Sequence, residues 1–437
     1  MFQIQNSNLA ENKSFLEKGK TEENILKSGM IILTIAFPWL FFLYSKPLEL
    51  LKQSFLLLIV GVMLVVSLVG IIKKGTLEWR RNRFNWVVIF LSFLLGVLFL
   101  YSNNHQISWE GYQGSFTSGV SEYVTFFIFY LLGTQFFSKN SWRQNLEMFI
   151  FSLSASSIFL VMLAYFGKSE FITANFARTP SLVVAVCGVT SLALWWTVKV
   201  KEKIMDWLNL FSALALLFIS SVLDYTLSWW VWAAGTGIIV FFDFLFKHRG
   251  ELERIDQRQL GIPLPKNGSF LRNITKGKGK YLFFVFLFSF SQATSPLILH
   301  TEKVSFMPYY SALLNHPILL DKILFYLVLE FFILVFGIVA FLSGKTEKNL
   351  TLAISGSLFG IMTGQLLYYS ESTLLYFLIW MLFVFASLTF LRKQKELDYL
   401  REFKVSGQGK KAFAIFAIGI SIIILVLVFL RGISLFN

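Results

Sequence analysis

Two residues of this chain combine a reactive or anion-binding side chain with a position just before a long apolar stretch. Arg178 precedes Thr179 and Pro180, and a guanidinium fork at the start of a helix suits a phosphate or pyrophosphate group. His316 lies in the segment NHPILLDK, and the ordinary histidine pKa of about 6.5 suits a general base at neutral pH. Taken alone, each residue also fits a plain surface role, an arginine at lipid headgroups or a polar histidine in a loop.

Three further residues could contact a substrate. Lys52 stands at the start of another apolar stretch and could be an extra anion contact. Trp109 and Tyr112 lie in the segment 103–121, which has three glycines, several polar groups and no Lys or Arg. Their rings suit the face of a sugar, and equally an aromatic belt at a membrane interface.

Polar residues inside the apolar stretches need a separate explanation, because intramembrane charge is costly and often functional. Glu330 lies two turns into such a stretch. It could face a cavity and hold a cation, or it could be a protonated or hydrogen-bonded carboxyl between helices. Gln365 needs a partner in the bundle and adjoins three glycines spaced by four, a pattern that permits close packing against a neighbouring helix: Gly356, Gly360 and Gly364.

The composition indicates which solvent surrounds these elements. Of 437 residues, 56% are hydrophobic and only 15% are charged, and Phe occurs 50 times. Soluble proteins have about 25% charged residues, and so much exposed aromatic surface would aggregate. The chain is therefore predicted to be all-α, a polytopic helix bundle in a lipid bilayer. Its single cysteine, Cys187, rules out an intramolecular disulfide and a cysteine-based zinc site.

The expected architecture is one transmembrane domain over residues 1–437. A helix needs about 20 apolar residues to cross the hydrocarbon core. The domain comprises a cytoplasmic tail (1–26), eight spans (27–246), a basic cytoplasmic loop (247–280) and five further spans (281–437). The thirteen spans run over 27–45, 51–72, 84–102, 122–138, 145–166, 179–198, 204–223, 227–246, 281–299, 323–343, 349–369, 372–391 and 412–432.

The distribution of Lys and Arg predicts the orientation. With a cytoplasmic N-terminus, the inner segments hold 32 of the 39 basic residues, as the positive-inside rule requires. The C-terminus is then outside. Anionic lipid accounts for the net charge of +14, so no nucleic-acid partner is expected. The seven basic residues predicted to be outside are Lys46, Lys52, Lys168, Arg178, Lys303, Lys322 and Arg431.

Several segments, in their order along the chain, resemble the O-antigen ligase and polymerase superfamily of polytopic bacterial membrane proteins. HPILLD at 316–321 is similar to that family's His-Asn-x-x-Leu-Asp/Glu element. FARTPSLVVAVCGV, which contains Arg178, is similar to the element before the sixth span. The other similar segments are KPLELLKQSFLLLIVGVMLVV, the stretch 84–119 and the pair of spans that begins GIMTGQLLYYS at 360.

The resemblance implies a glycosyltransferase-type reaction without metal or nucleotide. Such ligases transfer a glycan from undecaprenyl pyrophosphate to the hydroxyl of a glycan or lipid acceptor at the outer leaflet. Arg178 is then expected to hold the pyrophosphate, Lys52 to add an anion contact, and His316 to act as the base. The expected location is the bacterial inner (cytoplasmic) membrane, which the chain crosses many times.

Two alternatives from other functional classes remain. In a transporter or flippase of an amphipathic or lipid-linked substrate, Glu330, Gln365 and the three glycines would line a pathway. In a non-catalytic envelope scaffold, no transfer would occur. The chain departs from the family pattern in ways that keep this second alternative open: Pro317 follows the histidine, and the loop 300–322 is short and lacks arginine.

Overall fold

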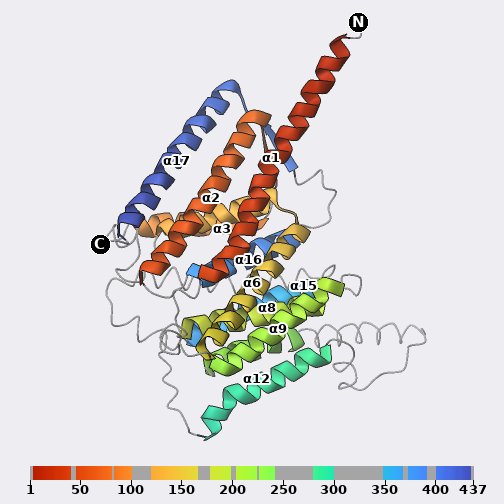
Figure 1. The fold of residues 1–437 in the computed structure, drawn as a ribbon, viewed down its shortest axis with the longest axis vertical. Coiled ribbons are helices and arrows are strands. Elements are labelled where there is room, and N and C mark those ends of the chain that lie inside the picture. The colour runs from red at the N-terminus through yellow and green to blue at the C-terminus, as the bar shows by residue number, and fades with distance from the viewer. Residues whose placement is uncertain are drawn as a thin grey trace, which may run out of the picture. The chain divides into compact units, whose positions relative to one another are not determined.

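The computed structural model of the chain is helical almost throughout the part that it describes (Figure 1). The described residues are 3–40, 46–80, 83–100, 120–165, 178–197, 203–223, 226–241, 279–299, 348–367, 373–390 and 400–434. The helices are α1 (Gln3–Leu40), α2 (Lys46–Lys74), α3 (Arg83–Leu100), α5 (Val120–Phe136), α6 (Lys139–Tyr165), α8 (Arg178–Thr197), α9 (Lys203–Leu223), the unlabelled helix Thr226–Phe241, α12 (Gly279–Leu299), α15 (Lys348–Leu367), α16 (Thr373–Phe390) and α17 (Gly407–Ser434).

Each of these helices overlaps the range of a predicted span, and the tenth span, 323–343, lies outside the described residues. The helical fold class is thus confirmed. Among the described residues, four helices are long and apolar enough to cross a membrane, over Leu51–Lys74, Lys139–Met162, Ile204–Val222 and Gly407–Leu427. At the N-terminus, α1 already begins at Gln3, so the segment 1–26 that was expected to be a tail is largely part of this helix.

The chain forms two compact units, unit 1 from residues 1–149 and 372–437 and unit 2 from residues 150–371. In unit 1, α2 packs between two antiparallel neighbours, α1 and α17 (Figure 1). Lys73 Nζ donates a hydrogen bond to Glu22 Oε1 at 2.9 Å, which joins the end of α2 to α1. Against α17, the glycine at position 61 lets Ile424 lie directly on the α2 backbone. The first helix of the chain, α1, and the last, α17, therefore both pack on α2.

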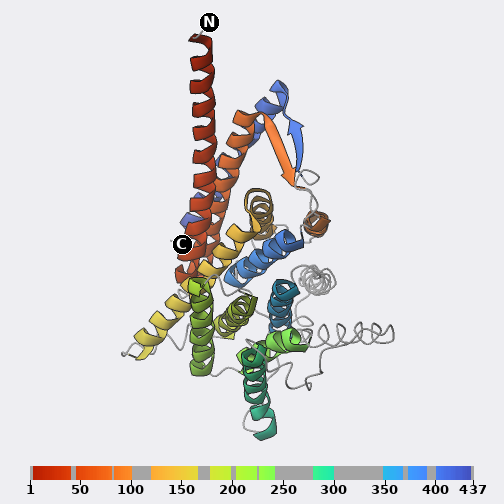
Figure 2. The same cartoon turned by 90° about the vertical axis from the view of Figure 1, so that its right-hand side faces the viewer.

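A two-stranded antiparallel sheet connects the same helices at one end of unit 1 (Figure 2). Strand β1 (Thr76–Arg80) follows α2, strand β2 (Leu400–Lys404) precedes α17, and Leu77 pairs with Phe403. Gly75 makes the turn into β1 with a φ of 70°, a conformation that few other residues adopt. Within the described residues, this sheet is the one departure from the all-α expectation. The two segments were expected to be basic loops, because their pairing is not visible in either one alone.

A polar network holds the sheet against α3, α5 and α16. The backbone N–H of Arg80 donates to Gln135 Oε1 at 2.7 Å, and its guanidinium donates to the Phe137 carbonyl at 2.9 Å. The buried Tyr130 hydroxyl lies 3.1 Å from both Asn85 Oδ1 and Ser387 Oγ. These contacts define a sheet end of unit 1. The opposite far end contains the last residues of α1 and the first residues of α2, α5 and α16.

The interior of unit 1 between the two ends is aromatic. The ring of Phe377 in α16 lies 4.9 Å from that of Phe37, 5.0 Å from that of Phe129 and 5.5 Å from that of Phe149. Trp142 is fully buried and donates its indole N–H to the Met381 carbonyl at 2.9 Å. The buried rings fill the interior of unit 1, and the buried indole of Trp142 also has a hydrogen-bond acceptor.

Unit 2 is arranged around α8, whose described side chains from Ser181 to Trp195 are all buried. On one side α9 runs antiparallel to it, and the Ser191 hydroxyl donates to the Asn209 carbonyl at 2.8 Å. On another side the helix 226–241 inserts Trp232 against Gly188. The indole N–H of Trp232 donates to Ser220 Oγ at 3.1 Å, so the ring is held at both of its ends.

The close packing predicted for the glycines of α15 is confirmed. A Cβ atom on Gly356 would lie 2.8 Å from the Gly235 carbonyl oxygen of helix 226–241. Gly360 faces the same helix, with Gly235 Cα 3.8 Å from its own Cβ position. Gly364 lies directly against Leu182 of α8. These glycines let α15 approach two neighbouring helices at backbone distance.

The Gly188→Ala variant should be destabilised. Its new methyl group overlaps the ring of Trp232, which is 1% exposed and hydrogen-bonded. We expect the free energy of unfolding to fall by about 1–3 kcal/mol, the usual cost of overpacking, although alanine is the better helix former. Thermal unfolding of the detergent-purified full chain measures this change.

Gly419→Ala is the matched control for this substitution. Gly419 also lies within a helix, α17, but beyond its own turn of the helix no described atom lies within 4 Å of the added carbon. This variant should be neutral or stabilised by up to about 1 kcal/mol. Equal melting temperatures for the two variants would contradict the packing of Trp232 on Gly188.

Candidate functional site

Three of the residues proposed from sequence fall in described helices. Lys52 lies in α2, and its side chain is described. Arg178 is the first residue of α8 and Gln365 is in the last turn of α15, and for both the structure describes the backbone. The other candidates lie outside the described residues: His316, Glu330, Trp109 and Tyr112.

Arg178 and Gln365 stand at the same end of unit 2. α8 and α15 pack against each other, and Gly364 of α15 contacts Leu182, which is one turn after Arg178 in α8. Because Arg178 is the first residue of its helix, it lies beside backbone N–H groups that have no partner within the helix. This is the partly positive end of the helix dipole, so backbone and side chain both favour an anion at this point.

Lys52 is buried rather than exposed at the helix start. It lies in the second turn of α2 with 1% of its surface exposed, beside the equally buried Gln53. An ammonium group is seldom buried without polar or charged neighbours, because its desolvation is costly. Its surroundings therefore decide what it can do.

Those surroundings are the far end of unit 1. Phe55 in α2 and Phe377 in α16 both pack against Phe37, at 6.5 and 4.9 Å between ring centroids. Lys52 is three residues before Phe55 and therefore lies on the same face of α2. Thr373 is four residues before Phe377 and lies on the same face of α16. Lys52 and Thr373 thus lie in the layer above these rings. The Thr373 hydroxyl is buried and has no hydrogen-bond partner among the described residues.

α5 adds a carboxylate to the same end. Glu122 is 3% exposed and lies in the first turn of α5, four residues before Phe126. Phe126 stacks on Trp380 at 6.1 Å, and Tyr123 meets Tyr376 edge-on at 5.8 Å. Among the described side chains at the far end, Glu122 is the only carboxylate. Among the described side chains, the far end therefore holds one buried cation and one buried anion, on helices that pack together.

Sequence reasoning missed Glu122, although a signal was present. It is the first residue of the predicted fourth span, 122–138, and hence a charge at the edge of an apolar stretch. From sequence alone, such a carboxylate is normally interpreted as facing solvent. Here it is buried because α5 packs against α2 and α16, which the sequence of α5 does not show.

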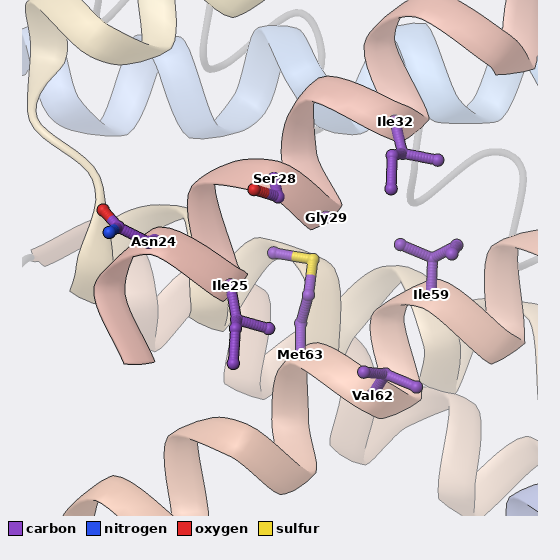
Figure 3. A pocket seen from close by; sticks show the side chains of 8 residues that line it. All are labelled: Asn24, Ile25, Ser28, Gly29, Ile32, Ile59, Val62 and Met63. Carbon is purple, nitrogen blue, oxygen red and sulfur yellow. The ribbon is translucent and has the colours of Figure 1, made fainter. Parts of the chain in front are cut away.

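A groove between α1 and α2 differs in character from the far end (Figure 3). It encloses about 330 Å³ and is lined mainly by aliphatic side chains, among them Ile25, Ile32, Ile59 and Met63. Its polar groups are those of Asn24 and Ser28. With no titratable side chain in its lining, this groove offers no acid, base or nucleophile. Among the described residues, no cluster of His, Cys, Asp or Glu could hold a metal ion.

Lys52 and Glu122 should prove energetically coupled. Lys52 and Glu122 are opposite charges buried at one end of unit 1, where the low dielectric strengthens their attraction over a distance, so Lys52→Met and Glu122→Gln should each lower the free energy of unfolding. The double variant should be no less stable than either single variant. A double-mutant cycle on the purified full chain, measured by thermal unfolding, gives the coupling energy.

The exposed pair of Glu23 and Lys27 is the control for this cycle. Its atoms are 2.6 Å apart, but both side chains are more than half exposed. The cycle of Glu23→Gln and Lys27→Met should give a coupling of only about 0.3–0.5 kcal/mol. Strictly additive effects of Lys52→Met and Glu122→Gln would show that these two residues do not interact.

No protein-family model, curated protein or solved structure matches this chain. The described residues define a helical protein in which four helices are long and apolar enough to cross a membrane. It carries a buried lysine and carboxylate at the far end of unit 1, and an arginine at the first position of the central helix of unit 2.

Proposed function

We propose that the protein is an O-antigen ligase-like membrane glycosyltransferase. It transfers a glycan from undecaprenyl pyrophosphate to an acceptor hydroxyl at the outer leaflet of the bacterial inner membrane. The observation that carries the proposal is the position of Arg178 as the first residue of α8, the place along a helix best suited to a pyrophosphate. The family resemblance of the segments around Arg178 and His316 supplies the reaction.

The proposal includes thirteen spans with the N-terminus inside, and the arrangement of unit 1 supports this topology. The sheet end is formed by Lys73 and Lys74, by β1 and β2, and by Lys410 and Lys411 at the start of α17. Glu22 of the N-terminal region joins Lys73 there, and the Phe137 carbonyl, just before Lys139, accepts from Arg80. Four segments predicted to be inner and basic thus adjoin one end of the unit, as expected for a cytoplasmic face.

The proposed reaction is a displacement at the anomeric carbon of the donor. His316 accepts the proton of the acceptor hydroxyl while its oxygen forms the new glycosidic bond. The bond from the anomeric carbon to the pyrophosphate oxygen breaks, and undecaprenyl pyrophosphate leaves with the electron pair. Arg178 binds that pyrophosphate and stabilises its developing charge. Trp109 and Tyr112 provide ring faces for the sugars, and Lys52 supports an anion at the far end of unit 1.

The transporter alternative rests partly on the glycine face of α15 as the wall of a pathway. In the structure this face is covered, because Gly356 and Gly360 pack on helix 226–241 and Gly364 packs on Leu182. This packing favours the transferase over a route along these glycines. Glu330 and Gln365 remain the residues on which a transporter or flippase would depend, and an inactive envelope scaffold would depend on none of these residues.

Substitution of the two proposed catalytic residues tests the transferase. In liposomes with the full chain and an undecaprenyl pyrophosphate-linked oligosaccharide, His316→Ala should reduce transfer by about 10²–10⁴-fold, the usual contribution of a general base. Arg178→Lys should also lose activity, because an ammonium group cannot form the bidentate contact with the pyrophosphate. His300→Ala, a change to another predicted outer-loop histidine, is the control and should leave transfer intact.

The outcomes separate the three functional classes. Full transfer by His316→Ala would exclude this residue as the base. Movement of the lipid-linked glycan between leaflets without any transfer, and its loss in Glu330→Gln, would indicate the transporter. If the wild-type chain shows neither transfer nor movement of the lipid-linked glycan, the non-catalytic scaffold is the remaining function.

Cysteine labelling tests the topology. Cys187 is buried and is the only cysteine of the chain, so a Cys187→Ala background allows single cysteines to be introduced. Ser138→Cys and Ser406→Cys lie at exposed positions of the sheet end. In intact cells they should resist a membrane-impermeant maleimide and react only after permeabilisation. Ser118→Cys, in the predicted outer loop, should react in intact cells, and the reverse pattern would overturn the orientation.

A further inference from the structure

The turn from α2 into β1 brings lysines from distant parts of the chain together. The Val405 N–H donates to the Gly75 carbonyl at 2.8 Å, and Thr76 pairs with Lys404. Residues directly opposite on paired strands have Cα atoms about 5 Å apart. Lys74, which ends α2, therefore lies close to Lys404, and the first turn of α17 follows at once. The sheet end thus concentrates charge that the sequence distributes over two loops.

The charge is strongly positive. The segments 73–80 and 400–411 contain seven Lys or Arg residues against two glutamates, Glu78 and Glu402. Three of the seven have structural partners. Lys73 is paired with Glu22, Arg80 is bonded to Phe137, and the Lys410 ammonium lies over Gly75, at the carbonyl end of α2, where the helix dipole favours a cation.

Three other lysines are presented to the surroundings. Lys74, Lys404 and Lys411 are exposed and form no ion pair with any described residue. The pKa of Glu23 is lowered mainly by its hydrogen bond to Lys27, and the charge of Lys74 lowers it only slightly further. We call Lys74, Lys404 and Lys411 the lysine triad. Each has a long flexible stem and can reach an anion above the sheet.

Apolar and aromatic groups accompany the triad. Phe403, next to Lys404, is 49% exposed. By register and pleat it shares one face of the sheet with Leu77, directly opposite, and with Trp79. Both of these are partly exposed. By the same pleat Lys404 lies on the other face of the sheet, with Thr76 directly opposite it. Lysines and aromatic rings at the ends of apolar helices are typical of the headgroup region of a membrane.

We propose that the lysine triad forms a docking surface for the headgroups of anionic phospholipids, whose phosphates the three ammonium groups bind. The occupant is a lipid rather than a free anion, because Lys74 ends one helix that is long and apolar enough to cross a membrane and Lys411 lies near the start of another. Lysines at such helix ends lie at the level of the headgroups. This surface belongs to unit 1, and it does not depend on the transferase proposal.

Native mass spectrometry of the detergent-purified full chain can test the surface. The probes are phosphatidylglycerol and phosphatidylcholine with identical acyl chains. A lysine near an anionic membrane surface strengthens binding by roughly fivefold. The triple variant Lys74→Gln, Lys404→Gln, Lys411→Gln should therefore bind phosphatidylglycerol at least tenfold more weakly than the wild type, with phosphatidylcholine unchanged. The corresponding triple arginine variant keeps the charge and should keep the preference.

The control removes the same charge from the same predicted side of the membrane. Lys276→Gln, Lys278→Gln, Lys280→Gln should keep the preference for phosphatidylglycerol. An equal loss in this control would show that only net charge matters, and an unchanged lysine triad variant would also overturn the proposal. Displacement of phosphatidylglycerol by inorganic phosphate would assign the surface to a free anion instead.

A second measurement covers the case in which the triple variant does not fold. The single variants Lys404→Gln and Lys411→Gln change exposed side chains, and each should weaken phosphatidylglycerol binding by roughly fivefold. Phe403→Ser changes the opposite face of the strand from Lys404 and should leave the preference for phosphatidylglycerol unchanged. Unchanged binding in both single lysine variants would refute the docking surface.

Discussion

The antiparallel packing of α17 on α2, completed by the pairing of β1 with β2, is the constraint on which unit 1 depends. It joins the first part of the chain to its last part, with Thr76 opposite Lys404. Two small residues make it possible: Gly61 lets Ile424 reach the α2 backbone, and Gly75 turns the chain into the strand with a φ of 70°. A side chain at position 61 would collide with Ile424 of α17, and a side chain at position 75 would be strained by the positive φ.

From this constraint the two ends of unit 1 acquire different chemistry. The sheet end gathers lysines and an extended hydrogen-bond network through Arg80, Asn85 and Tyr130. The far end has few charges, and those that the structure describes, Lys52 and Glu122, are buried. In a low dielectric an isolated charge is very costly, and two opposite charges at one end limit that cost. One end of unit 1 is therefore exposed and positively charged, and the other encloses its described polar groups.

Unit 2 uses a different device. Its central helix α8 is buried along its described length, and its neighbours approach through glycines, with Trp232 on Gly188 and α15 on Gly235. Between apolar helices in lipid, close van der Waals contact replaces the hydrophobic effect as the source of association. A rigidly packed α8 also fixes the direction of its N-terminus, so Arg178 starts from a well-supported backbone position. In the proposed transferase, such support would preorganise the contact of Arg178 with the pyrophosphate.

The sequence by itself determined the helices, because the apolar runs that form them are local: α2, α3, α9 and α12 begin and end within a few residues of the predicted spans. It also determined that the glycines of α15 form a packing face, because a spacing of four places them on one side of any helix. Only the tertiary structure decided which helix that face meets, that TLEWR and LREFK pair as strands, and that Lys52 and Glu122 are buried. Each of these depends on contacts between residues far apart in the chain. A local pattern can show that a lysine starts an apolar stretch, but whether water or another helix covers it depends on how the helices pack.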